Sequence, residues 1–127
     1  MKLSEVLNSQ DNWQQCLLAA NAEGRSVSVL SAECCRCCLL GAIAKATAEG
    51  DDANRSRFTR VCKLTKKVIC KLGFFKGGEW ADYCSSPGAV IVTFNDEPTT
   101  TFDMVRQVVE EVERQYADTE DLCSPAR

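Results

Sequence analysis

The spacing of apolar residues predicts a mostly helical chain with four or five helices. A short helical turn follows Ser4, and Asp11 is a suitable N-cap for a second helix that would end at Gly24. In this second helix, apolar side chains recur at positions i, i+3, i+4 and i+7, the spacing of one buried helical face. The side chains that it would bury are Trp13, Cys16, Leu17 and Ala20.

Two longer amphipathic helices are predicted in the second half of the chain. One covers about residues 55–72 and ends at Gly73, and the other begins after the cap Thr101 and extends to about Tyr116. Both have an apolar stripe that predicts packing against a core. The stripes consist of Phe58, Val61, Cys62, Thr65, Val68, Ile69 and Leu72 in the first helix, and Phe102, Val105, Val109, Val112 and Tyr116 in the second.

Two short extended segments complete the predicted fold. Residues 27–30 alternate in polarity and residues 89–94 are apolar and β-branched, so we expect them to form a two-stranded β element. Residues 73–88 contain four glycines and one proline and are expected to form a loop, from which Trp80 and Tyr83 return to the core. The prediction is therefore an α+β, mostly helical fold with a single domain over residues 1–116 and a flexible tail over residues 117–127.

A cluster of cysteines is the most unusual feature of the sequence. Residues 34–38 read Cys-Cys-Arg-Cys-Cys, and the chain contains nine cysteines and no histidine. We expect Ser31 to cap a central helix that extends to Gly50 and carries the cluster. On that helix the four thiols point toward two apolar faces, which favours cysteine as a small packing residue.

Two other interpretations of the cysteines stay open. Four thiolates could bind zinc, and the candidate ligands are Cys34, Cys37, Cys38 and Cys62. Alternatively, Cys34 and Cys37 form a Cys-x-x-Cys pair near a helix N-terminus, where the helix dipole and Arg36 would lower a thiol pKa and favour redox chemistry.

Composition and length limit the class of protein. The chain has 127 residues, 45% of them hydrophobic and 26% charged, which suits one globular domain. It lacks an apolar run long enough for a transmembrane helix, and its first residues do not resemble a signal peptide. We therefore expect a cytoplasmic protein whose thiols stay reduced.

Positive charge is concentrated in the first of the long helices. Residues 55–76 contain eight basic residues and no acidic one, so the other seven basic and 18 acidic residues give the remainder a charge of −11 within a total of −3. A continuous basic face indicates a docking surface for an acidic protein, or alternatively for nucleic acid. Its members are Arg57, Arg60, Lys63, Lys66, Lys67 and Lys71.

A solvated surface, or pairing with glutamates of the last helix, would explain the same charges. Glu110, Glu111 and Glu113 could neutralise the basic face within one molecule or in a homodimer. These alternatives stay open at the level of the sequence.

Recognisable catalytic motifs are missing from the sequence. Without histidine there is no imidazole base, and the nucleophile elbow, the phosphate-binding loop and the dinucleotide fingerprint are also missing. We therefore expect a non-enzymatic binding protein without a cofactor, with zinc as the alternative cofactor.

Three stretches together resemble a family of unknown function whose members are small bacteriophage and bacterial proteins. They are Asp11-Asn12-Trp13, Arg36-Cys37-Cys38-Leu39-Leu40-Gly41-Ala42 and Asn95-Asp96-Glu97-Pro98. Family members commonly carry Arg-Trp-Cys-x-x-Gly-Ala and Asn-Asp-x-Pro, so Cys37 stands where tryptophan is usual. The resemblance implies an origin in a phage or mobile element, action in a bacterial cytoplasm and no catalytic residues. It also implies framework roles for Trp13, Cys38, Gly41, Asn95, Asp96 and Pro98.

Overall fold

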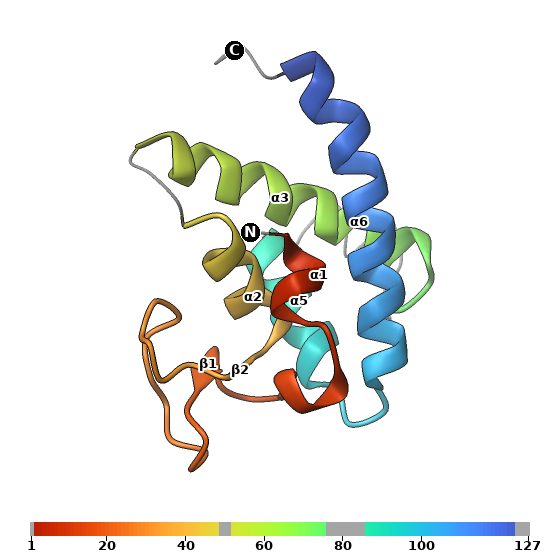
Figure 1. Ribbon diagram of the computed structural model, residues 1–127. Coiled ribbons are helices and arrows are strands. Elements are labelled where there is room, and N and C mark those ends of the chain that lie inside the picture. Colours follow the sequence, from red (N-terminus) through yellow and green to blue (C-terminus); the bar gives the residue numbers. More distant parts are fainter. Residues whose placement is uncertain (1, 49–51, 76–85, 124–127) are drawn as a thin grey trace.

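A computed structural model describes residues 2–48, 52–75 and 86–123 of the protein, and its described part is mostly helical with one small antiparallel sheet (Figure 1). These residues confirm the predicted α+β class. The elements are α1 (Leu3–Val6), a 3-10 turn η1 (Gln10–Asn12), β1 (Ala19–Ala20), β2 (Arg36–Cys37), α2 (Leu39–Ala46), α3 (Asp52–Lys71), α5 (Pro87–Asp96) and α6 (Phe102–Cys123).

The core lies where the helices meet. Helix α3 packs against α5 and α6, while the short helices α1 and α2 contact each other and cover the remaining sides of the core (Figure 1). Helix α5 contributes large side chains to the core, because Val90, Ile91 and Phe94 are all at most 1% exposed. Burial of such aliphatic and aromatic groups is the main force that holds the helices together.

The two long amphipathic helices form as predicted. Their apolar stripes face the core, except that Leu72, at the end of the predicted α3 stripe, is exposed. Helix α3 ends in a Schellman motif in which Gly73 adopts φ +77°, Phe74 N–H donates to the Ile69 carbonyl and Gly73 N–H donates to the Cys70 carbonyl. Phe74 then stacks on Phe94 with ring centroids 5.7 Å apart. Thr101 caps α6 by accepting a hydrogen bond from Met104 N–H, although the helix continues to Cys123 instead of ending near Tyr116.

The predicted second helix is wrong, as is the strand over residues 27–30. The segment after η1 is irregular, and Cys16 adopts φ +77°, which no α-helix accommodates. Ala19 and Ala20 instead pair antiparallel with Cys37 and Arg36, so the two-stranded element exists but uses other residues. Residues 27–30 lie in turns that Ser28 and Ser31 stabilise through their side-chain oxygens.

The predicted strand over residues 89–94 is also wrong, because these residues belong to α5. The Ser86 side chain accepts a hydrogen bond from Ala89 N–H at 3.2 Å, and Pro87 occupies the first helical position. This Ser-Pro pair is a helix start signal that the sequence interpretation missed. A short apolar run that is buried on most sides shows no polar period, so its hydrophobicity alone does not separate a helix from a strand.

The cysteine cluster lies before a helix, and the prediction that Ser31 starts a helix containing it is wrong. Helix α2 begins at Leu39 with Cys38 as its N-cap, and residues 31–37 form turns and β2. The chain at Leu18 crosses directly over this helix start, and the Leu18 carbonyl accepts a hydrogen bond from Cys38 N–H at 3.2 Å. A Cβ at Gly41 would lie only 1.9 Å from the same carbonyl oxygen, so this crossing requires glycine.

Several sequence predictions concern residues outside the described part of the chain. Trp80 and Tyr83 belong to this group, as do residues 124–127 of the predicted tail. Within the described residues, none of the helices is both long and apolar enough to cross a membrane.

Replacing Gly41 with alanine tests the crossing of Leu18 over α2. Because the new methyl group would overlap a backbone carbonyl, we expect Gly41→Ala to lower the free energy of unfolding by about 2–4 kcal/mol in urea denaturation. Gly88→Ala is the matched control, since no heavy atom lies within 4 Å of its added Cβ. That variant should be unchanged or up to about 1 kcal/mol more stable, because alanine favours helix. Equal stability of the two variants would contradict the close crossing.

Candidate functional site

The residues of the Asn-Asp-x-Pro motif meet the N-terminal segment at the end of α5. The Asn95 side chain is fully buried, and its Oδ1 accepts hydrogen bonds from Trp13 Nε1 at 2.7 Å and from Leu39 N–H at 2.9 Å. Its Nδ2 donates to the Gln14 carbonyl at 3.1 Å and to Asp96 Oδ1 at 2.9 Å. Both donors and both acceptor positions of this amide are therefore used. One side chain joins the N-terminal segment, α2 and α5.

The neighbours of Asn95 extend this connection. Asp96 Oδ1 also accepts a hydrogen bond from Cys16 N–H at 2.8 Å, and Gln15 Nε2 donates to the Asn95 and Glu97 carbonyls at 3.0 and 2.9 Å. These carbonyls lie at the C-terminus of α5, where a helix leaves its last acceptors without intrahelical partners. Pro98 follows directly and prevents the helix from continuing.

Cys38 and Gly41 complete the same framework at the N-terminus of α2. Cys38 Sγ accepts a hydrogen bond from Gly41 N–H at 3.3 Å, while the Leu39 amide donates to Asn95 Oδ1. The framework residues named from the family resemblance thus lie at one junction of the backbone and fill structural positions there.

The thiols of the cysteine cluster have different environments. Cys34 Sγ and Cys37 Sγ lie 3.6 Å apart beside a cavity of about 140 Å³ that Lys45 and Asn12 also line. Cys37 is buried, Cys34 is half-buried, and Cys35 is exposed. The structure therefore brings together the Cys-x-x-Cys pair, but in a turn and strand instead of a helix.

Burial makes the inner thiols poor nucleophiles. Desolvation, together with the hydrogen bond to Cys34, raises the pKa of Cys37 to about 12, and desolvation also raises the pKa of Cys38. Burial raises the pKa of Cys62 to about 11. Because the thiolate is the reactive form, these three cysteines are largely inert at neutral pH and serve as packing residues.

The four candidate zinc ligands are not gathered. Cys38 Sγ accepts a hydrogen bond from the α2 backbone, and Cys62 lies on α3 in the core. In the described ranges, no group of three or more cysteine, aspartate or glutamate side chains could hold a metal ion.

The six residues of the predicted basic face divide into two groups. The exposed group consists of Arg60, Lys63, Lys67 and Lys71, whereas Arg57 and Lys66 are half-buried. Lys71 Nζ lies 3.6 Å from Glu111 Oε2 on α6, so part of the alternative pairing with the last helix exists. Hydrogen bonds from Arg114 and Gln115 lower the pKa of Glu111 to about 2, which keeps this partner ionised.

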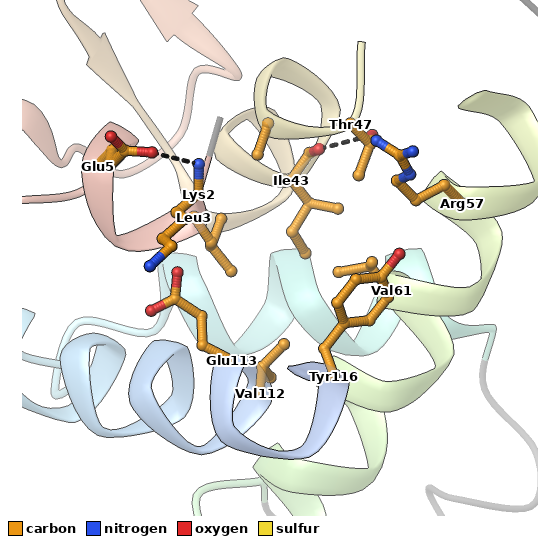
Figure 2. A pocket seen from close by; sticks show the side chains of 11 residues that line it. Lys2, Leu3, Glu5, Ile43, Thr47, Arg57, Val61, Val112, Glu113 and Tyr116 are labelled. Carbon is orange, nitrogen blue, oxygen red and sulfur yellow. Dashed lines mark hydrogen bonds between the residues drawn. The ribbon is translucent and has the colours of Figure 1, made fainter. Parts of the chain in front are cut away.

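A pocket of about 360 Å³ opens between α1, α2, α3 and α6 (Figure 2). Its apolar wall comes from Leu3, Ile43, Val61 and Val112, and its polar groups come from Lys2, Glu5, Thr47, Arg57, Glu113 and Tyr116. Sequence reasoning missed this pocket, because four separate elements form it and no local pattern marks it. One signal in the sequence was Arg57, which lies at the edge of the apolar stripe of α3.

A family model described as "Family of unknown function (DUF6197)" matches residues 2–115. The chain belongs to this family. Comparisons with curated proteins and with solved structures give no match.

The DUF6197 match spans every element that builds the sites described above, from α1 to most of α6. It includes the Asn95 junction, the thiols of residues 34–38, the basic face and the lining of the pocket except Tyr116. The family assignment therefore applies to residues 2–115, and the function must be argued from the sites themselves.

Removing the Asn95 amide tests the junction. Asn95→Ala leaves Trp13 Nε1 and the Leu39 amide without their acceptor, so we expect a loss of about 3 kcal/mol or more in the free energy of unfolding. Thr93→Ala, at an exposed position of the same helix, should change stability by less than about 0.5 kcal/mol. Chemical denaturation followed by circular dichroism measures both. A loss below about 1 kcal/mol for Asn95→Ala would show that the junction does not hold the fold.

Alkylation rates test the environments of the thiols. With iodoacetamide at pH 8, the exposed Cys16 and Cys35 should react at least about a hundredfold faster than Cys37 and Cys62, because a raised pKa leaves very little thiolate. Mass spectrometry of peptides gives the rate at each site. In urea the rates should converge, which serves as the control. Fast modification of Cys37 in the native protein would contradict its burial.

Proposed function

We propose that this DUF6197 protein is a non-enzymatic interaction protein that docks an acidic partner protein through α3. The observation that supports it best is a stripe of three exposed cations, Arg60, Lys63 and Lys67. Their spacing of i, i+3 and i+7 places them on one side of the helix. Among the described residues, none of the three has a carboxylate within ion-pair distance.

Unneutralised cations on an otherwise acidic chain favour this function. The chain has a net charge of −3 and an isoelectric point near 5.0, so the stripe is a local exception to the sign of the remainder. Such local complementarity steers association and selects partners of opposite charge. Because Lys71 is already paired with Glu111, the proposed docking face is the shorter stripe of Arg60, Lys63 and Lys67.

An acidic protein fits this face better than nucleic acid does. The stripe contains no aromatic side chain on which a base could stack, and the acidic remainder of the chain would repel phosphates. The resemblance to bacteriophage and bacterial proteins supports a phage or mobile-element origin and a host protein in the bacterial cytoplasm as the partner.

Charge reversal tests the docking face. Capture from a bacterial lysate identifies a partner, whose affinity is then measured with purified proteins. We expect Lys63→Glu combined with Lys67→Glu to weaken binding by about tenfold or more, because juxtaposed like charges are costly. Arg25→Glu combined with Arg36→Glu changes the net charge equally at exposed positions outside α3 and should bind as the wild type does.

Two outcomes would contradict the proposal. Equal loss in both double variants would indicate a response to net charge alone. Capture that disappears after nuclease treatment, with an affinity that falls steeply with salt, would indicate nucleic acid as the partner.

A further inference from the structure

The pocket between α1, α2, α3 and α6 has a polar end whose free groups are hydrogen-bond donors. Figure 2 shows the Arg57 guanidinium and the Tyr116 hydroxyl pointing toward the same end, beside Thr47. Within the described part of the chain, neither Arg57 nor Tyr116 has a hydrogen-bond or ion-pair partner. Thr47 Oγ1 uses its proton on the Ile43 carbonyl at 2.8 Å. Among the residues that the structure describes, this end therefore has no negatively charged acceptor.

The carboxylates of the pocket are occupied at its other end. Glu113 Oε2 accepts hydrogen bonds from the Ser4 amide at 3.0 Å and the Ser4 hydroxyl at 2.9 Å, and Glu5 Oε1 accepts one from the Lys2 amide at 2.6 Å. Hydrogen bonds to the first turn of α1 thus hold both carboxylates in place. Arg57 is half-buried and faces the cavity, and no counter-ion for it lies among the described residues, although a guanidinium that is partly removed from water normally has one.

We propose that this pocket binds a small organic carboxylate, whose charged group lies between Arg57 and Tyr116 and whose apolar body lies against the aliphatic wall. The cavity of about 360 Å³ falls within the usual size of small-molecule sites. A planar guanidinium matches a carboxylate with two parallel hydrogen bonds. Because Glu5 and Glu113 also face the cavity, a monoanion is favoured over a doubly charged phosphate ester.

This site is separate from the proposed docking face, since Arg60, Lys63 and Lys67 do not line the pocket. Arg57 was assigned from the sequence to the same face as these residues. The structure directs it to a cavity instead, so the two proposals can fail independently.

Calorimetric titration of the full chain with defined probes tests the carboxylate site. We expect hexanoate and 4-phenylbutyrate to bind, whereas acetate, which lacks an apolar body, and hexan-1-ol, which lacks a charge, should bind at least about tenfold more weakly. Arg57→Gln should lower the affinity for hexanoate by about tenfold or more, because a charge-assisted hydrogen bond is lost. Tyr116→Phe should lower the affinity for hexanoate by a smaller factor, because only one neutral hydrogen bond is lost.

Arg25→Gln is the matched control, because Arg25 is exposed and lines neither pocket. It should bind hexanoate as the wild type does, and the Lys63→Glu, Lys67→Glu variant should retain hexanoate binding even if partner docking is lost. Thermal unfolding of Arg57→Gln without ligand should match the wild type, since the guanidinium has no partner within the described residues.

Four results would overturn the proposal. The first two are equal affinities for hexanoate and acetate, and equal affinities for hexanoate and hexan-1-ol. The other two are an unchanged affinity for hexanoate in Arg57→Gln, and no binding of hexanoate or 4-phenylbutyrate at about 10 mM.

Discussion

The buried amide of Asn95 is the interaction on which the N-terminal half of the fold depends. A single side chain satisfies the indole N–H of Trp13, the first amide of α2 and a carbonyl of the irregular segment. Each of these groups would cost free energy if it were buried without a partner. Because the amide is fully buried and all its hydrogen-bonding positions are used, the end of α5, the start of α2 and the segment after η1 take one arrangement. The close approach of Leu18 to Gly41 and the cap that Cys38 provides both follow from this arrangement.

The positions of the two proposed sites follow from the packing of α3 and α6. Their apolar stripes direct one side of each helix into the core, so the cations of α3 divide according to their angle around the helix. Those farthest from the core are exposed, Lys71 reaches Glu111 on α6, and Arg57 turns to the cavity beside α1 and α2. On α6, Glu113 joins α1 through Ser4 while Val105, Val109 and Val112 are buried within the same chain. The stripe of α6 is therefore used inside the molecule.

Elements whose stability comes from their own periodicity were predicted correctly. Helices α3 and α6 each have a long amphipathic pattern, and the end signal at Gly73 and the start signal at Thr101 are local. The basic stripe could be read from the same pattern. The errors concern α5, whose run of apolar residues has no polar side, and residues 13–37, whose backbone partners lie on distant segments. In the segment 13–16 the helical spacing of apolar residues is overridden, because Asn95 and Asp96 bind its carbonyl and amide groups directly.

By itself, the sequence determined the mostly helical class and the two long helices. Those properties depend on contacts within a few turns of helix or on the identity of single residues. Only the tertiary structure decided that the cysteine cluster precedes a helix, that Cys34 and Cys37 meet, and that Arg57 faces a pocket while its neighbours face solvent. These outcomes depend on which distant backbone groups and side chains share a buried space. That pairing is long-range, since Trp13 and Asn95 are 82 residues apart, and no local pattern encodes it.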